Sequence, residues 1–145
     1  MRKKHEMTIE FDSCSENESF ARMVTAAFIT RLDPTVGEMS DVKTAVSEAV
    51  TNAIIHGYEK KEGTIVIHGI IRDDELWLEI QDKGVGITDI DKAMEPCYTT
   101  KPELDRSGMG FAFMEAFMDK LEVSSEPGKG TTVHMYKKFD SAQKE

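Results

Sequence analysis

The sequence is short of cysteine, of proline and of long apolar runs, and each shortage excludes a class of protein. Among its 145 residues are only 2 Cys and 4 Pro. Cys14 and Cys97 have neither the spacing of a metal site nor the number that a disulfide framework needs. No stretch approaches the roughly eighteen consecutive apolar residues of a membrane-spanning helix. The basic start MRKKHEM is followed by TIEFDSCSENES, with no apolar segment of a signal peptide. We therefore expect a soluble cytoplasmic protein without a membrane association.

Positive charge is scarce as well. The chain has 18 Lys and Arg against 27 Asp and Glu, for a formal net charge of -9. Direct nucleic-acid binding is not expected, because phosphate backbones are held by clustered Lys and Arg. A small anionic ligand is compatible with this charge, since backbone N–H groups and a metal ion can hold it locally. The length allows one domain over residues 1–145, with a polar tail at about 139–145 that we expect to be frayed.

Hydrophobic periodicity predicts strands in adjacent pairs, with helices between the pairs. Alternation in MTIEF predicts a strand with Ile9 and Phe11 on one face, and a helix follows at about 16–32. A second helix is expected from about Ser40 or Asp41 to Gly57. The stretches GTIVIHGIIR and ELWLEIQD then predict a hairpin. A glycine-rich connection over 83–110 follows, with a short helix predicted at DIDKAME. A further helix is predicted in FAFMEAFMDKL, and its apolar side would consist of Phe111, Met114, Phe117, Met118 and Leu121.

The chain ends in two further strands, LEVSSE and TTVHMY, joined by the turn PGKG. A strand, two helices, a hairpin, a helix and another hairpin do not give the strict strand–helix alternation of a Rossmann fold. Adjacent strand pairs instead predict an α+β two-layer sandwich, in which helices cover one face of a mostly antiparallel sheet.

The second predicted helix carries an unusual polar edge. At about 100° per residue, Glu48 and Asn52 stack one turn apart, away from the apolar stripe. They are either a solvated face or a catalytic base and a metal ligand, and the helix alone leaves both interpretations open. His56 extends the same row and is typical of a residue that interacts with a helix end. The apolar stripe predicted to enter the core consists of Val42, Val46, Ala49, Val50 and Ala53.

Two glycine-containing motifs could contact a ligand. In DKGVGI, Asp82 follows a strand and could accept a hydrogen bond from an exocyclic amine, while Gly84 and Gly86 lack the Cβ atoms that would block a flat ligand. The alternative is a simple turn with glycines at positive φ. In TTKPELDRSGMGF, the glycines precede a helix whose backbone N–H groups could bind a phosphate, with Lys101 and Arg106 nearby. The alternative there is a surface loop, and GKGTT alone is typical of a hairpin turn.

The order of these motifs resembles that of the GHKL ATPase family, which includes gyrase B subunits, heat-shock chaperones, mismatch-repair ATPases and histidine kinases, and which has the Bergerat nucleotide-binding fold. The resemblance covers nearly the whole chain. It is greatest to the bacterial anti-sigma factor kinases, and among these to the sporulation anti-sigma factors. The stretches that carry it are SENESFAR, LDPT, SEAVTNAIIHGY, GVGI, TTKPEL with RSGMGF, and GKGTT.

The resemblance implies ATP or ADP with Mg²⁺ as cofactors, and it implies a role for individual residues of the nucleotide site. Glu48 would be the general base, Asn52 would ligate Mg²⁺, and Asp82 would bind the adenine amino group, with Gly84 and Gly86 beside the base. Residues from about 88 to 107 would form the ATP lid. The remaining nucleotide contacts implied are Thr99, Thr100, Lys101, Arg106 and Ser107 in the lid, Gly108, Met109 and Gly110 in the phosphate cradle, and Thr131 near the adenine.

The same resemblance implies an activity and partners. The chain would use ATP to phosphorylate a serine of an anti-anti-sigma protein and, in its other state, would bind and inhibit a sporulation sigma factor. Arg22 would contact both partners, and the first strand could pair with its copy in a homodimer. One alternative is a general-stress anti-sigma kinase with another sigma target. A nucleotide-dependent binding module without phosphotransfer is a second alternative, which Glu48 disfavours because binding alone needs no base.

Overall fold

Five strands form one sheet in the computed structural model, which describes residues 4–94 and 110–140. All four neighbouring strand pairs are antiparallel, in the order β1-β2-β3-β5-β4. The predicted α+β class with a mostly antiparallel sheet is therefore confirmed. The strands are β1 (Lys4–Asp12), β2 (Thr64–Arg72), β3 (Glu75–Asp82), β4 (Lys120–Glu126) and β5 (Gly130–Lys138).

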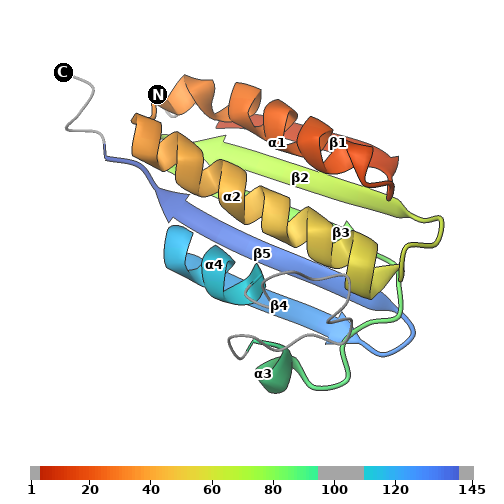
Figure 1. The fold of residues 1–145 in the computed structure, drawn as a ribbon. Helices are drawn as coiled ribbons and strands as arrows, with labels where there is room; N and C mark the ends of the chain where they lie inside the picture. The colour runs from red at the N-terminus through yellow and green to blue at the C-terminus, as the bar shows by residue number, and fades with distance from the viewer. Residues whose placement is uncertain (1–3, 95–109, 141–145) are drawn as a thin grey trace.

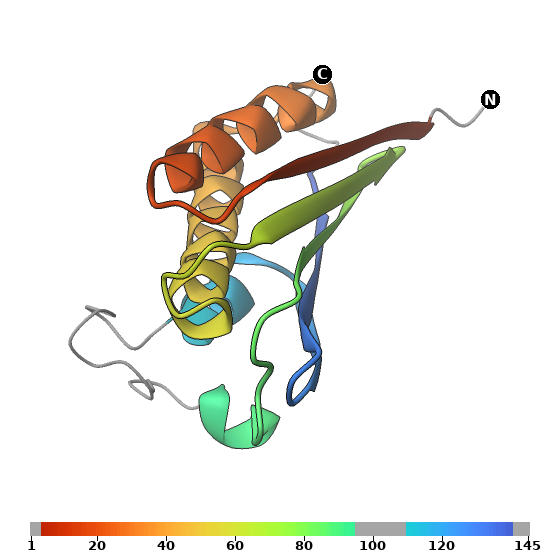
Figure 2. The same cartoon turned by 90° about the vertical axis from the view of Figure 1, so that its right-hand side faces the viewer.

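The helices α1, α2 and α4 lie on the same face of the sheet, and α2 packs between the other two (Figure 1). The side view shows that the opposite face of the sheet has no helix over it among the described residues (Figure 2). None of the described helices is long and apolar enough to cross a membrane. Their bounds are α1 (Glu16–Ile29) with a 3₁₀ turn at Thr30–Leu32, α2 (Val36–Asn52) with a π-helical turn at Ala53–Gly57, α3 (Ile90–Ala93) and α4 (Gly110–Phe117).

The core lies between these helices and the sheet. Apolar residues recur about every 3.6 residues along the helices and every second residue along the strands, so both elements present an apolar face to it. All five residues of the stripe predicted on α2 are buried, at 4% exposure or less. Alternate residues of β2 and β3 face them, among them Ile65, Ile67, Leu76, Leu78 and Ile80.

Two predicted helix boundaries are wrong. Helix α2 begins at Val36 rather than near Ser40 or Asp41, because Thr35 and Glu38 form a capping box. The N–H of Glu38 donates to Thr35 Oγ1 at 3.0 Å, and the N–H of Thr35 donates to Glu38 Oε1 at 2.9 Å. This exchange satisfies N–H groups that a helix start otherwise leaves without a partner. Helix α4 ends at Phe117, so Leu121 belongs to β4 rather than to the helix.

Candidate functional site

Asp82, the last residue of β3, is a buried carboxylate at the end of the sheet. It is 7% exposed, and its Oδ1 accepts a hydrogen bond from the N–H of Gly84 at 2.9 Å. Burial raises the pKa of Asp82, and hydrogen bonds from the backbone N–H groups of Gly84 and Thr131 oppose that shift. A buried carboxylate held by backbone donors is a fixed hydrogen-bond acceptor, as the recognition of an amine requires.

The end of α2 lies directly against this carboxylate. A Cβ atom on Gly57 would come within 2.9 Å of Asp82 Cγ, and one on Gly84 within 2.0 Å of the Gly57 carbonyl oxygen. The N–H of Val85 donates to that same oxygen at 2.8 Å. Gly86 has φ of 77° and packs against the backbone of Glu126, which a Cβ would approach to 2.1 Å.

These contacts explain why glycine is needed at positions 84 and 86, and the explanation differs from the predicted one. The space left by their missing Cβ atoms was predicted to receive a flat ligand, whereas the chain's own backbone fills that space. The glycines are thus required for the loop after β3 to lie against the end of α2. Any contact that they make with a ligand has to come from their backbone.

The final turn of α2 is a π-helix, Ala53–Gly57, closed by a hydrogen bond from the N–H of Tyr58 to the Ala53 carbonyl at 2.9 Å. Such wider turns occur frequently at functional sites. The Tyr58 hydroxyl donates to the Thr64 carbonyl at 2.6 Å and accepts from the N–H of Lys83 at 2.7 Å. Tyr58 therefore ties the end of α2 to the start of β2 and to the residue that follows Asp82.

A row of three polar residues crosses the sheet beside the π-helical turn. Asp82 pairs with Thr131 of β5, and Thr131 pairs with Ser125 of β4. Thr131 is 9% exposed, and its hydroxyl lies 2.8 Å from the Ser125 hydroxyl. Residues directly opposite in neighbouring strands project to the same face. The predicted adenine contacts Asp82 and Thr131 are thus neighbours, and Ser125 supports Thr131 from the far side.

The opposite end of the candidate site lies where α2 meets α4. A Cβ on Gly110, the first residue of α4, would come within 2.9 Å of Asn52 Nδ2 and 3.0 Å of Asn52 Oδ1. The amide of Asn52 therefore lies against the N-terminus of α4. Glu48 is half-buried one turn earlier on α2. The last two turns of α2 thus connect the Glu48–Asn52 pair with Asp82.

The residues at this end suit a magnesium ion better than a closed metal site. Within residues 4–94 and 110–140, no group of three or more His, Cys, Asp or Glu is arranged to hold a metal. Magnesium is commonly bound through one or two protein oxygens, with substrate phosphates and water completing its shell. The amide oxygen of Asn52 fits such an arrangement, because it lies against the N-terminus of α4, whose N–H groups favour phosphate.

The remaining predicted nucleotide contacts are in the lid and the phosphate cradle. The structure describes the start of the predicted lid, where Asp89 caps α3 by accepting from the N–H of Lys92 at 3.1 Å. The predicted contacts that lie outside the described residues are Thr99, Thr100, Lys101, Arg106, Ser107, Gly108 and Met109.

Arg22, the predicted partner-binding residue, lies between α1 and α2. Its Nη1 atom donates to Glu18 Oε1 at 2.8 Å and to Ser47 Oγ at 3.4 Å. Ser47 directly precedes Glu48 on α2. The Arg22 side chain is about one-third exposed, so it combines a fixed position beside Ser47 with access from outside.

Comparison with known proteins identifies the family. The sequence profile described as "Histidine kinase-like ATPase domain" matches residues 13–137. An anti-sigma F factor of Clostridium kluyveri is 62% identical over 135 residues, which are 93% of this chain and 95% of the relative. That of Clostridium acetobutylicum is 58% identical over 136 residues, 94% and 95% of the two chains. The chain belongs to the anti-sigma F factor family.

More distant comparisons agree with this assignment. The Bacillus licheniformis anti-sigma F factor is 52% identical over 141 residues, 97% of both chains. A crystal structure of RsbU and RsbW domains of a Mycobacterium tuberculosis protein aligns with a TM-score of 0.68, covering 93% of this chain and 32% of that one. At 19% identity, this likeness shows the shared fold alone. The resemblance drawn from the motifs is thus confirmed, and the histidine kinase-like ATPase domain implies nucleotide binding.

Three residues of this family member escaped the sequence argument. Gly57 was predicted to end the second helix but was not assigned to the site, and neither were Tyr58 and Ser125. Their importance depends on contacts with residues distant in sequence, such as Lys83 for Tyr58 and Ile87 for Ser125. Only Gly57 carried a local indication: Ala49, Ala53 and Gly57 recur every four residues, which allows a close approach to that side of the helix. In the structure it is Asp82 that makes this approach.

Proposed function

We propose that this chain is an ATP-dependent protein serine kinase that phosphorylates an anti-anti-sigma protein and, in its nucleotide-bound state, holds a sporulation sigma factor. The observation that carries the proposal is the connection made by α2. Its final turns join a buried acceptor, Asp82, to a carboxylate and an amide, Glu48 and Asn52, beside the first residue of α4. Such an arrangement suits a ligand with a base at one end and phosphates at the other.

In this proposal Asp82 accepts hydrogen bonds from the adenine amino group, and Thr131 lies beside it. The backbone of Gly84 and Gly86 borders the base. Phosphates lie at the N-terminus of α4, in the predicted cradle Gly108, Met109 and Gly110, with lid contacts from Thr99, Thr100, Lys101, Arg106 and Ser107. Asn52 would hold Mg²⁺ through its amide oxygen, and the bound ion would supply positive charge against the charge that develops in phosphoryl transfer.

Glu48 is the proposed general base. Its carboxylate accepts the proton of the partner's serine hydroxyl as the serine oxygen bonds to the γ-phosphorus of ATP. The bond from that phosphorus to the bridging oxygen of ADP breaks in the same transfer. Half-burial on a rigid helix suits this work, because the carboxylate is held in position and is still reachable by a protein substrate.

The partners follow from the same family membership. Arg22, fixed beside Ser47, would contact both the sigma factor and the anti-anti-sigma protein. A homodimer is supported by the place of β1 at the edge of the sheet, where no described strand pairs with its outer side. A second copy of β1 could extend the sheet there. The proposed location is the cytoplasm, where a sigma factor acts.

Phosphate transfer to the partner tests this function. The purified chain, Mg²⁺ and ATP labelled in the γ-phosphate would be incubated with a purified anti-anti-sigma protein, and label on serine would be measured by mass spectrometry. The proposal predicts transfer by the parent chain, and from Glu48→Gln at least a hundredfold slower transfer with ATP affinity unchanged. Transfer by Glu48→Gln at the parental rate would exclude Glu48 as the base. ATP binding without transfer by the parent would favour a binding module.

A further inference from the structure

Ser125 of β4 lies within hydrogen-bonding distance of three groups. The N–H of Ile87 donates to Ser125 Oγ at 2.7 Å. Ser125 Oγ lies 2.9 Å from the Gly130 carbonyl oxygen and 2.8 Å from Thr131 Oγ1. A serine hydroxyl has one proton, and a carbonyl oxygen can only accept. All three bonds form together only if Ser125 donates to Gly130 and Thr131 donates to Ser125.

This assignment determines what Thr131 can offer a ligand. Its single hydroxyl proton is directed at Ser125, so only its lone pairs remain available. Asp82, its cross-strand neighbour, is a carboxylate that accepts from the N–H groups of Gly84 and Thr131. Both side chains are buried on the helix-covered face of the sheet, at 7% and 9% exposure. This end of the site therefore presents two acceptors and no side-chain hydroxyl donor.

We propose that Ser125 is a positioning residue for base selection. By taking the proton of Thr131, it makes the site accept a purine with an amino group at position 6 and reject a purine with an oxygen there. The amine brings two protons to the acceptors, whereas a 6-oxo group brings lone pairs that face Asp82 and Thr131. A buried acceptor opposite another acceptor is left without a partner, and that strongly disfavours the wrong ligand. The inference rests on the proposed nucleotide site.

The test compares ATP with inosine triphosphate, which differs from ATP in its 6-oxo group and protonated N1. Equilibrium dissociation constants for both would be measured by calorimetry with the parent chain, Ser125→Ala and Ser125→Cys. The ratio of the two constants is the readout. Loss of the Ile87 and Gly130 hydrogen bonds weakens both nucleotides alike and cancels in the ratio. We expect the preference for ATP to fall about tenfold in both variants, because the Thr131 proton becomes free to turn toward a 6-oxo group.

Two controls separate proton direction from general damage. Ser125→Thr keeps the hydroxyl and is expected to retain the parental ratio. In a Thr131→Val background there is no proton to direct, so adding Ser125→Ala is expected to leave the ratio unchanged. Ser125→Cys keeps nearly the volume of the side chain but replaces the hydroxyl oxygen by sulfur, a weak acceptor. It serves as the test variant if Ser125→Ala does not fold.

The outcomes distinguish this inference from the proposed function. A parent chain that binds neither nucleotide contradicts the proposed function itself. A parent chain that prefers ATP, together with folded Ser125→Ala or Ser125→Cys whose ratio stays within twofold of the parent, overturns the assignment of Ser125 alone.

Discussion

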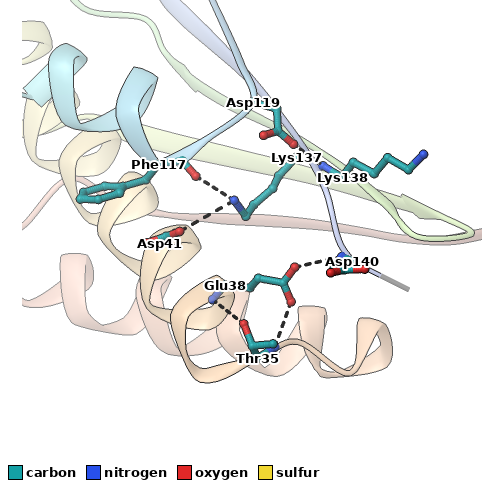
Figure 3. A network of polar contacts seen from close by, with 8 residues as sticks. All are labelled: Thr35, Glu38, Asp41, Phe117, Asp119, Lys137, Lys138 and Asp140. Carbon is teal, nitrogen blue, oxygen red and sulfur yellow. Dashed lines mark hydrogen bonds and ion pairs between the residues drawn. The ribbon is translucent and has the colours of Figure 1, made fainter. Parts of the chain in front are cut away.

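The first turn of α2 is stabilised by side-chain hydrogen bonds, whereas its last turn is held largely by close contacts with the backbone of the loop after β3. Glu38 joins three groups at the start: it accepts from the N–H of Thr35, donates its own N–H to Thr35 Oγ1, and accepts from the N–H of Asp140 at 3.0 Å (Figure 3). These are surface hydrogen bonds of a helix cap, and each could be replaced singly. The start of α2 is therefore expected to affect folding and to leave ligand binding unchanged.

A buried lysine adds side-chain contacts near the same end of α2. Lys137 of β5 donates to the Phe117 carbonyl, at the end of α4, at 3.0 Å, and its ammonium lies 3.8 Å from Asp41 Oδ2 of α2 (Figure 3). One side chain thus connects β5, α4 and α2. The orphan carbonyl at the end of α4 gains a donor, which is why a lysine is tolerated at 9% exposure.

The other end of α2 is held mainly by close contacts, to which the Tyr58 hydroxyl adds its hydrogen bonds with Thr64 and Lys83. Gly57 meets the Asp82 carboxylate, and its carbonyl oxygen meets the backbone of Gly84 and accepts from the N–H of Val85. Backbone contacts of this kind leave no room for even one methyl group. The comparison teaches that contacts at the start of α2 serve stability alone, whereas contacts at its end serve stability and binding together, and substitutions at the two ends should show this difference.

The largest effect is expected from Gly84→Ala. Its Cβ would lie 2.0 Å from the Gly57 carbonyl oxygen, so the loop after β3 would have to leave the end of α2. We expect a loss of about 3 kcal/mol in the free energy of unfolding, by urea titration, and no detectable ATP binding. Gly37→Ala is the matched control in the first turn of α2, where the nearest atom would be 3.9 Å away. It should gain about 0.5–1 kcal/mol and bind ATP normally. Equal effects of the two changes would contradict the comparison.

Asp82→Asn should separate binding from folding. The pKa of Asp82 is raised by burial, so the folded chain holds this proton more readily than the unfolded chain, whose ordinary value is 3.8. The stabilisation is complete below 3.8 and is lost as the pH rises through the higher folded value.

Relative to the parent, Asp82→Asn should therefore become more stable as the pH rises from about 4 to 7, measured as the midpoint of thermal unfolding. ATP affinity should fall about a hundredfold, because an amide replaces one acceptor oxygen by a donor. A stability difference that does not shift in favour of Asp82→Asn as the pH rises, or a variant that still binds ATP tightly, would speak against a buried acceptor at this position.

Glu38→Ala should give the smallest effect and affect folding alone. It removes the hydrogen bonds from the N–H groups of Thr35 and Asp140. We expect a loss of about 1 kcal/mol in the free energy of unfolding and an unchanged ATP dissociation constant. Glu38→Gln keeps one acceptor oxygen, so it can retain one of the two hydrogen bonds and should lose less. A weakened ATP affinity in Glu38→Ala would show that the start of α2 is coupled to the site.

The sequence predicted the elements that depend on short periods and missed what depends on distant contacts. The stripe from Val42 to Ala53 and the alternation of β2 and β3 were readable, because burial follows their spacing. The start of α2 was predicted about one turn too late, although Thr35 and Glu38 have the spacing of a capping box and indicate a start at Val36.

The π-helical turn and the purpose of the glycines could not be predicted in the same way. Both depend on where Gly57, Gly84 and Asp82 meet, and these residues come together only when β3 pairs within the sheet. The motif order nonetheless brought Glu48, Asn52 and Asp82 into one hypothesis. Family resemblance, rather than periodicity, supplied their separate functions.

The central claim is that α2 places a metal ligand at one end of a nucleotide and meets the buried base acceptor at the other. ATP binding measured with and without Mg²⁺, for the parent chain and Asn52→Ala, tests it most directly, with adenosine as a probe of the base end alone. We predict that Mg²⁺ strengthens ATP binding to the parent at least tenfold, and that Asn52→Ala abolishes this gain and leaves adenosine binding unchanged. An undiminished Mg²⁺-dependent gain in folded Asn52→Ala would contradict the account.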